Sequence, residues 1–211
     1  MSATTGRRER KKAATRQKIA DTALRLFVER GFEAVGIRDV AAAADVAVTT
    51  VFSHFASKEA LVFEREDDFE ERLLRAATGR APDEPLIPAL RREILALVRH
   101  CVVDEAAETW RVIDESPALR GYEEAMKRRH ATTLAAAIAD DLGLPGVTTA
   151  CRTLAKFVVD AYTLAREAAD PEAAVDEIFH MIEAAWTARP AAAEAGVEAG
   201  GPGQRAGQGR G

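Results

Sequence analysis

The sequence contains little that an enzyme active site or a metal centre needs. It has only two cysteines, Cys101 and Cys151, and their separation matches no metal-binding or redox motif. Its four histidines form no HExxH pair, and no glycine-rich loop follows a strand-like segment to cradle a phosphate. No nucleophile elbow is present either. We therefore expect no enzyme activity, no catalytic residue, no metal and no cofactor.

Long apolar runs are also missing from the chain. No stretch reaches the ~18 apolar residues that a membrane-spanning helix requires. The basic N-terminus lacks the apolar segment of a secretory signal. We expect a cytoplasmic protein with no membrane partner.

Helix-favouring residues dominate the composition. Aromatic residues make up only 6% of the chain, and the apolar 47% includes many alanines. Ala, Leu, Glu and Arg favour helix, and no alternating strand pattern occurs. The sequence therefore predicts an all-α fold of about nine helices. The expected helices cover residues 13–30, 37–44, 48–54, 58–77, 86–103, 104–115, 117–142, 147–169 and 171–188.

The charge is distributed unevenly along the chain. Taken alone, the net charge of −5 argues against a nucleic-acid partner. Residues 1–58, however, carry 11 Lys and Arg against 6 Asp and Glu, whereas residues 59–190 carry 16 against 26. A basic head on an acidic body can hold phosphates locally while the body repels them. This asymmetry suggests a nucleic-acid partner without being specific for one.

Two short helices, 37–44 and 48–54, joined by a three-residue turn, form a helix-turn-helix pattern. Apolar residues are expected to hold the two helices together: Val40, Ala41, Ala44, Val46, Val51, Phe52 and Phe55. The opposite side of the second helix carries short polar residues, which are suited to reaching base edges and phosphates. The pattern predicts that this second helix reads DNA.

Residues 19–62 resemble the DNA-binding domain of the tetracycline-repressor (TetR) family. The matching elements are the A..LF.ERGF run, the RDVA..A helix and the TVF.HF.SKE.LV segment, a combination far more specific than a generic helix-turn-helix. The resemblance implies a transcriptional regulator, most often a repressor, that a small-molecule effector releases from a palindromic operator. It also implies a divergent helical domain that binds this effector and forms a homodimer through the last two helices.

On this resemblance the chain divides into four parts. Residues 1–12 form a basic arm that we expect to be disordered, and residues 13–58 form the three-helix helix-turn-helix domain. Residues 59–189 form the ligand-binding and dimerisation domain, in which helix 58–77 is expected to move like a lever and separate the two DNA-reading helices. Residues 190–211, with almost no bulky apolar side chain, are expected to be disordered.

The chain departs from the family pattern at four positions. Gly36 replaces the usual capping Ser or Thr, Asp45 replaces the turn Gly, and Ala47 replaces a Ser or Thr before the DNA-reading helix. Phe52 occupies the position of an aromatic residue that often offers a hydroxyl to phosphate. Because these changes remove individual phosphate contacts, the alternative of a helical protein-interaction module that has lost DNA binding stays open.

Six residues are candidates for DNA contacts: Arg38, Thr49, Thr50, Ser53, His54 and Lys58. Lys58 is expected in the first turn of helix 58–77, where backbone N–H groups and the helix dipole favour phosphate. His54 matches a phosphate-contacting position of the family. Arg38 could reach phosphate or pair with a neighbouring acid. For each of them, a surface or helix-capping role is the alternative. The basic residues of 7–12 could follow the backbone, enter a minor groove or be merely solvated.

Four residues are candidates for effector binding: Trp110, Arg111, Phe157 and Tyr162. An effector pocket combines an apolar lining with a few polar groups, and Arg111 could meet an anionic group if it were buried. The stretch 110–119 (WRVIDESPAL) resembles a TetR branch associated with acyl-CoA-like ligands, as in mycofactocin-associated regulators. An acyl-CoA or another hydrophobic effector is therefore expected.

The last two helices carry apolar faces suited to a four-helix dimer seam, although these faces could instead pack only within the monomer. The expected seam residues are Leu154, Phe157, Val158, Ala161, Leu164, Val175, Ile178, Phe179, Ile182 and Trp186.

Overall fold

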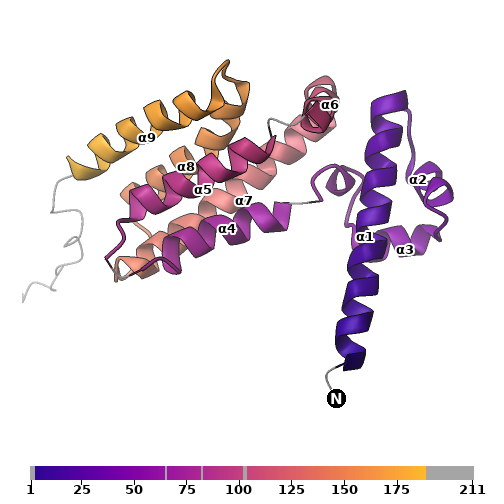
Figure 1. Cartoon of the computed structure of the whole chain (residues 1–211), viewed down its shortest axis with the longest axis horizontal. Coiled ribbons are helices and arrows are strands. Elements are labelled where there is room, and N and C mark those ends of the chain that lie inside the picture. The colour runs from indigo at the N-terminus through magenta and orange to yellow at the C-terminus, as the bar shows by residue number, and fades with distance from the viewer. Residues whose placement is uncertain (1–2, 65, 82, 102–103, 189–211) are drawn as a thin grey trace, which may run out of the picture.

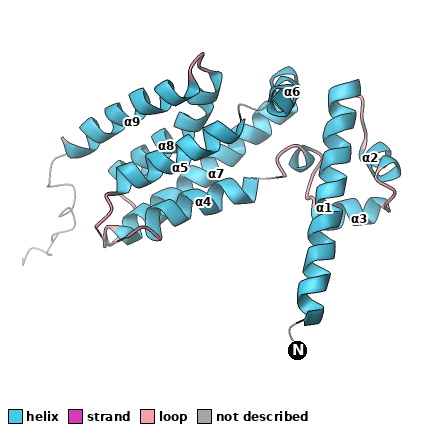
Figure 2. Ribbon diagram, in the orientation of Figure 1, coloured by secondary structure: helices cyan, strands magenta, loops and turns pink. Residues whose placement is uncertain are grey.

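The computed structural model describes residues 3–64, 66–81, 83–101 and 104–188. These residues form nine α-helices and one short 3₁₀-helix, and none of them belongs to a strand (Figure 2). The predicted all-α class is therefore confirmed. No described helix is both long enough and apolar enough to span a membrane. The tail expected to be disordered, residues 190–211, lies outside the described residues.

The N-terminal elements are α1 (Ala3–Arg30), α2 (Ile37–Ala43), α3 (Val48–His54) and the 3₁₀-helix η1 (Glu59–Leu61). The turn between α2 and α3 depends on Asp45, whose φ of 52° lies in the left-handed region. Asp tolerates this conformation better than most non-glycine residues, so the helix-turn-helix forms without the usual turn glycine.

The basic arm differs from the expectation. Disorder is expected over residues 1–12, whereas in the structure the described residues 3–12 belong to α1 (Figure 1). The physical reason is that no proline interrupts the segment and that Arg, Lys and Ala are good helix formers, so the helix of residues 13–30 extends towards the N-terminus.

The C-terminal elements are α4 (Glu66–Thr78), α5 (Leu86–Cys101), α6 (Asp104–Glu115), α7 (Pro117–Asp141), α8 (Thr149–Glu167) and α9 (Pro171–Thr187). A single helix over 58–77 is wrong, because the α-helix starts only at Glu66. The reason lies in Leu61 and Phe63, which are both buried in the same core. Residues two apart on an α-helix point about 200° apart, so a continuous helix could not bury both.

Two apolar cores organise the molecule. The larger core is formed by α4, α5, α7, α8 and α9. The second core contains the apolar residues of α1–α3 and η1, and it also takes in Val112 and Ile113 of α6 and Leu119 and Met126 of α7. The corner between α6 and α7 therefore belongs to the N-terminal core, and Figure 1 shows α6 beside α1. The boundary expected near residue 58 is not a boundary in the packing.

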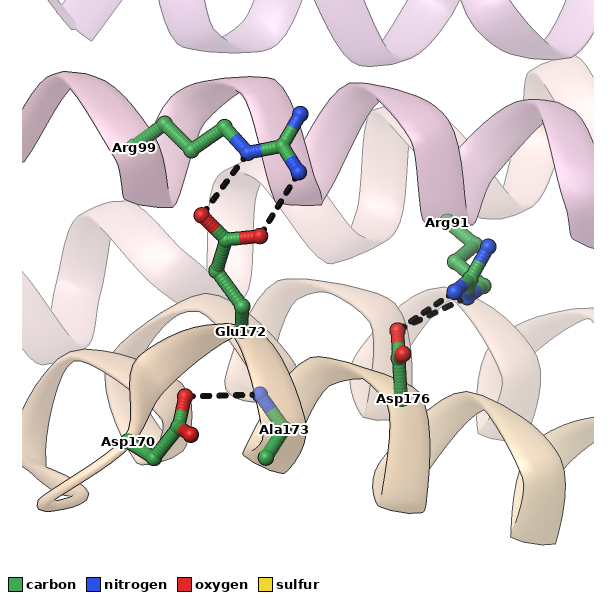
Figure 3. Close-up of polar contacts among 6 residues, drawn as sticks. All are labelled: Arg91, Arg99, Asp170, Glu172, Ala173 and Asp176. Atoms are coloured by element: carbon green, nitrogen blue, oxygen red, sulfur yellow. Dashed lines mark hydrogen bonds and ion pairs between the residues drawn. The ribbon is translucent and has the colours of Figure 1, made fainter.

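Surface ion pairs fasten α9 to α5 (Figure 3). Arg99 donates two hydrogen bonds to Glu172, of 2.9 and 2.6 Å, and Arg91 donates to Asp176. At the start of α9, the Asp170 carboxylate accepts a 3.0 Å bond from the N–H of Ala173. Solvent screens exposed pairs of this kind, so they orient α9 rather than dominate its stability.

A substitution at Ile113, which is only 1% exposed, tests whether the α6–α7 corner completes the N-terminal core. Ile113→Ala should lower the free energy of unfolding by about 2–5 kcal/mol, and Ile113→Val by about 0.5–1.5 kcal/mol, because each leaves a cavity in proportion to the atoms removed. Urea denaturation followed by circular dichroism measures both. A change near zero for Ile113→Ala would show that the corner does not pack as described.

Candidate nucleic-acid interface and effector site

One face of α3 is open to solvent. Thr49 and Ser53 are exposed on it, Thr50 is half-buried, and Val51 anchors the opposite side in the core. The Ser53 hydroxyl donates a 2.7 Å hydrogen bond to the carbonyl of Thr50, which leaves its oxygen free to accept another. The sequence-predicted polar residues of α3 thus share one accessible surface.

Phe52 lies on this exposed face and not in the core. The apolar pattern predicts Phe52 among the contacts between the two short helices, but its side chain is 55% exposed. It follows Val51, which points inward, and a helix turns about 100° per residue. An exposed aromatic ring on a helix of this kind can make apolar contact with a thymine methyl group.

His54 is half-buried at the end of α3. Its Nδ1 is buried and has no hydrogen-bond partner among the described residues. Burial, together with the positive charges of Lys12 and Arg16, lowers the pKa of His54 below its ordinary value of 6.5. The neutral form of the imidazole is therefore favoured in the protein without DNA.

Arg16 holds the end of α3 against α1, a role that no sequence motif indicated. Its Nη1 donates a 2.5 Å hydrogen bond to the carbonyl of His54, and its guanidinium lies 4.5 Å from the centre of the Phe55 ring. Its Nε lies 3.5 Å from a carboxylate oxygen of Glu64. Arg16 thus joins α1, α3 and the segment that leads to α4.

Lys58 is engaged within the protein. It precedes the three-residue η1 and not a long helix, so the helix-dipole argument for its phosphate contact does not apply. Its Nζ donates a 2.5 Å hydrogen bond to the carbonyl of Phe32 and lies 4.0 Å from the centre of the Phe32 ring. A phosphate contact by Lys58 stays a prediction, and it would require this ammonium group to be shared or released.

Arg38 is exposed in the first turn of α2 and makes no ion pair with any described residue. Its neighbour Asp39 instead accepts a 2.8 Å hydrogen bond from the N–H of Gly36. This bond provides the half of a capping box that glycine allows, and so the missing Ser or Thr cap is partly replaced.

The four effector candidates do not form one site. The Trp110 and Tyr162 rings lie edge to face, with 6.5 Å between centroids. Arg111, in contrast, is 57% exposed and lies 3.9 Å from Glu115 of its own helix, and Phe157 is 50% exposed on the outer side of α8. Arg111 follows Trp110 by one helical position, so the two side chains point in different directions.

A cluster of aromatic and charged side chains surrounds Trp110 and Tyr162. Arg166 lies 3.5 Å from the centre of the Trp110 ring and 3.4 Å from Glu123, with the arginine and glutamate side chains only 9% and 13% exposed. Phe69 packs between Tyr162 and the buried His130, at 5.2 and 5.4 Å. Sequence reasoning missed these neighbours because they come from separate helices.

The cluster around Trp110 and Tyr162 is separate from the hollow that lies between α5 and α9. A shallow hollow of about 290 Å³ lies between α5 and α9, lined by residues that include Arg91, Asp176 and His180. The cluster does contain one unsatisfied group, because the indole Nε1 of Trp110 is buried without a hydrogen-bond partner in the described structure. An acceptor atom of a ligand would satisfy it.

Most of the predicted dimer seam packs within the monomer. Six of its residues are buried in the larger core: Leu154, Val158, Ala161, Val175, Phe179 and Ile182. Phe157 and Leu164 remain 50% and 56% exposed on α8, and Met181 of α9 is 58% exposed. These three large apolar side chains are left exposed on the last two helices.

The lowered pKa of His54 predicts that stability falls as the pH falls. The unfolded chain protonates His54 near its ordinary pKa of 6.5, whereas the folded chain protonates it only at lower pH. Lowering the pH through this range therefore favours unfolding. Thermal denaturation between pH 7.5 and 5 should show the decline, and His54→Asn should reduce it.

Lys12→Gln provides a control for this effect, because it removes one of the two positive charges that disfavour the imidazolium. NMR titration should show a higher pKa for His54 in this variant. An unchanged pKa would mean that Lys12 does not face α3.

The helix-turn-helix region is similar to a known family of proteins. Residues 19–64 match the family model for bacterial regulatory proteins, tetR family. The chain is 34% identical over 97 residues to the HTH-type transcriptional regulator TcmR of Streptomyces glaucescens, a match that covers 44% of this chain and 43% of TcmR. It is 31% identical over 128 residues to the putative mycofactocin biosynthesis transcriptional regulator MftR of Mycobacterium tuberculosis, covering 56% and 60% of the two chains. The chain thus spans about half the length of the curated relatives it matches.

Solved structures share the fold. A complex of SmeT with triclosan superposes with a TM-score of 0.57 and 22% identity over 82% of this chain and 91% of SmeT. A second SmeT structure is described as the repressor of the Stenotrophomonas maltophilia multidrug efflux pump SmeDEF. It superposes with a TM-score of 0.55 and 23% identity, over 81% of this chain and 89% of SmeT. GusR of Salmonella enterica superposes with a TM-score of 0.54 and 19% identity, over 82% of this chain and 96% of GusR. The arrangement of α1 to α9 is thus the fold of these structures, and residues 19–64 match the tetR family of bacterial regulatory proteins.

Proposed function

We propose that the protein is a transcriptional repressor that binds operator DNA through α3 and is released by a small-molecule effector. The observation that carries the proposal is the exposed face of α3, where Thr49, Phe52 and Ser53 are accessible together. An exposed aromatic ring between two short polar side chains can combine apolar and hydrogen-bonding contacts to base edges in a major groove. Exposed Arg38 on α2, without an ion-pair partner in the described chain, supplies a cation for the flanking phosphate.

The operator-bound form is proposed to be a homodimer. Phe157, Leu164 and Met181 are large apolar side chains left half-exposed on the last two helices, and a second copy would cover them. A two-fold dimer presents two copies of α3, which would match a palindromic operator.

The effector site is proposed at the cluster around Trp110 and Tyr162. Its aromatic rings, the buried Arg166–Glu123 pair and the indole N–H that lacks an acceptor suit a hydrophobic ligand that carries an acceptor group. An acyl-CoA thioester has both properties. Because these side chains contact one another, a ligand that enters between them would have to rearrange them, and the rearrangement could displace α6.

We infer that the effect of effector binding reaches the DNA-binding elements through α6 rather than through a lever formed by residues 58–77. Trp110 of α6 contacts the effector cluster, and Ile113 of the same helix is buried in the N-terminal core. At the α6–α7 corner, the hydroxyl of Ser116 donates a 2.9 Å hydrogen bond to Glu33, which lies in the segment between α1 and α2. A displacement of α6 would therefore act on α1 and α2 directly.

Operator binding is tested with duplexes selected from a randomised library by the purified protein. Arg38→Gln should weaken binding to all duplexes and lower the slope of log K against log salt by about 0.9 for each phosphate that Arg38 neutralises. Phe52→Ala should instead relax sequence preference at one position, by about 1–3 kcal/mol per base pair. Arg111→Gln, which removes an equally exposed charge on α6, should leave binding unchanged. Failure to select any duplex would favour the interaction-module alternative.

The route through α6 is tested with Glu33→Ala, which removes the tether to Ser116 while keeping the serine cap of α7. An effector is first identified by thermal-shift screening of acyl-CoA thioesters. The variant should bind this effector as wild type does but should show a smaller effector-induced change in operator affinity, because the two sites are then less coupled. Glu115→Ala, at an exposed pair on α6, is the matched control. Undiminished release in Glu33→Ala would exclude this tether.

A further inference from the structure

The first turns of α1 extend beyond the rest of the N-terminal domain (Figure 1). Every residue from Arg7 to Ala14 is exposed, and the first buried side chain of α1 is that of Ile19. Residues 7–18 contain seven basic residues and one acid, Glu9. The segment is thus a strongly basic helix whose first turns are open to solvent within the described chain.

One face of this helix continues the exposed end of α3. Arg8, Lys12 and Arg16 are spaced four residues apart, so they lie along one side of α1. Arg16 is bonded to the carbonyl of His54, and Lys12 is close enough to act on the His54 imidazole. Arg7 and Arg10 lie on roughly the opposite side of the helix. We call the side with Arg8 and Lys12 the arm face.

The charges of the arm are unfavourable for the protein alone. The first turn of α1 contains no acid, although the positive end of the helix dipole favours one there. Arg8 and Lys12 are like charges at i and i+4, a spacing that costs about 0.2–0.5 kcal/mol per pair. Neither side chain has an ion-pair partner among the described residues. A bound polyanion would supply negative charge near the positive end of the helix dipole, and it would offset the repulsion between Arg8 and Lys12.

We propose that the arm face binds the phosphodiester backbone of duplex DNA just outside the segment that α3 contacts, a proposal that rests on operator binding by α3. The distance from Arg16 to Ala3 along the helix is about 20 Å, at about 1.5 Å per residue. That length corresponds to about six base pairs at about 3.4 Å each. The arm therefore lengthens the footprint on each side of the operator and adds affinity that does not depend on sequence.

The test compares two duplexes that carry the operator selected from the randomised library. One ends at the operator, and the other has ten extra base pairs on each side. The wild type should bind the longer duplex more tightly and with a steeper salt dependence, by about 0.9 in slope for each additional phosphate that is neutralised. The readout is the ratio of the two affinities, measured by fluorescence anisotropy.

Two double variants separate the arm face from general charge. Arg8→Gln with Lys12→Gln should abolish most of the preference for the longer duplex, whereas Arg7→Gln with Arg10→Gln, which removes the same charge from the opposite side, should retain most of it. Glutamine keeps the helix propensity close to that of the residues it replaces. Circular dichroism of each variant checks that α1 remains helical.

The outcomes are distinct. Equal wild-type affinity for the two duplexes would overturn the proposal while leaving operator binding intact. An equal reduction in both double variants would also overturn it, because the interaction would then be unspecific for the arm face. Failure of the wild type to select any operator would instead count against the proposed function itself.

Discussion

The structure depends on the packing of the α6–α7 corner into the N-terminal core. Ile113 and Leu119 are buried there, at 1% and 0% exposure, among the apolar residues of α1–α3. A domain of about 60 residues is marginal alone, because too little of its surface is buried on folding. The corner enlarges this core, so the unit that carries α3 shares its stability with the larger helical domain. This shared core joins the N-terminal unit to the larger helical domain without a continuous connecting helix.

Helices set by local periodicity and by Pro or Gly breaks could be predicted closely from the sequence. The expected bounds of α3 and α6 agree with the structure, and the expected turn between the two short helices forms with Asp45 in the left-handed region. The expected helix 58–77 was wrong because burial of Leu61 and Phe63 against α1–α3 overrides local propensity. Phe52 was misplaced for a related reason, since hydrophobicity alone does not say which side of a short helix faces the core.

The candidate sites could be predicted from the sequence less completely than the helices. The helix-turn-helix pattern points to Thr49, Ser53 and Arg38, because the places of these residues on two short helices follow from positions close together along the chain. Arg16 and Arg166 escaped prediction because their partners, the carbonyl of His54 and the carboxylate of Glu123, are 38 and 43 residues away in sequence. Contacts over such separations exist only once the helices have packed.

The pairing of charges explains how an acidic protein can present a positively charged surface. In the larger domain several arginines are occupied by nearby acids: Arg80 forms two bonds with the largely buried Asp141, and Arg99 forms two with Glu172. Such pairs cancel much of each other's field at short range. Arg8 and Lys12 of the N-terminal arm have no such partners among the described residues, so their field extends into solvent, where salt screens it over about one Debye length, ~8 Å at physiological salt. The net charge of −5 therefore does not describe the charge of the N-terminal arm, which is the surface that attracts a polyanion.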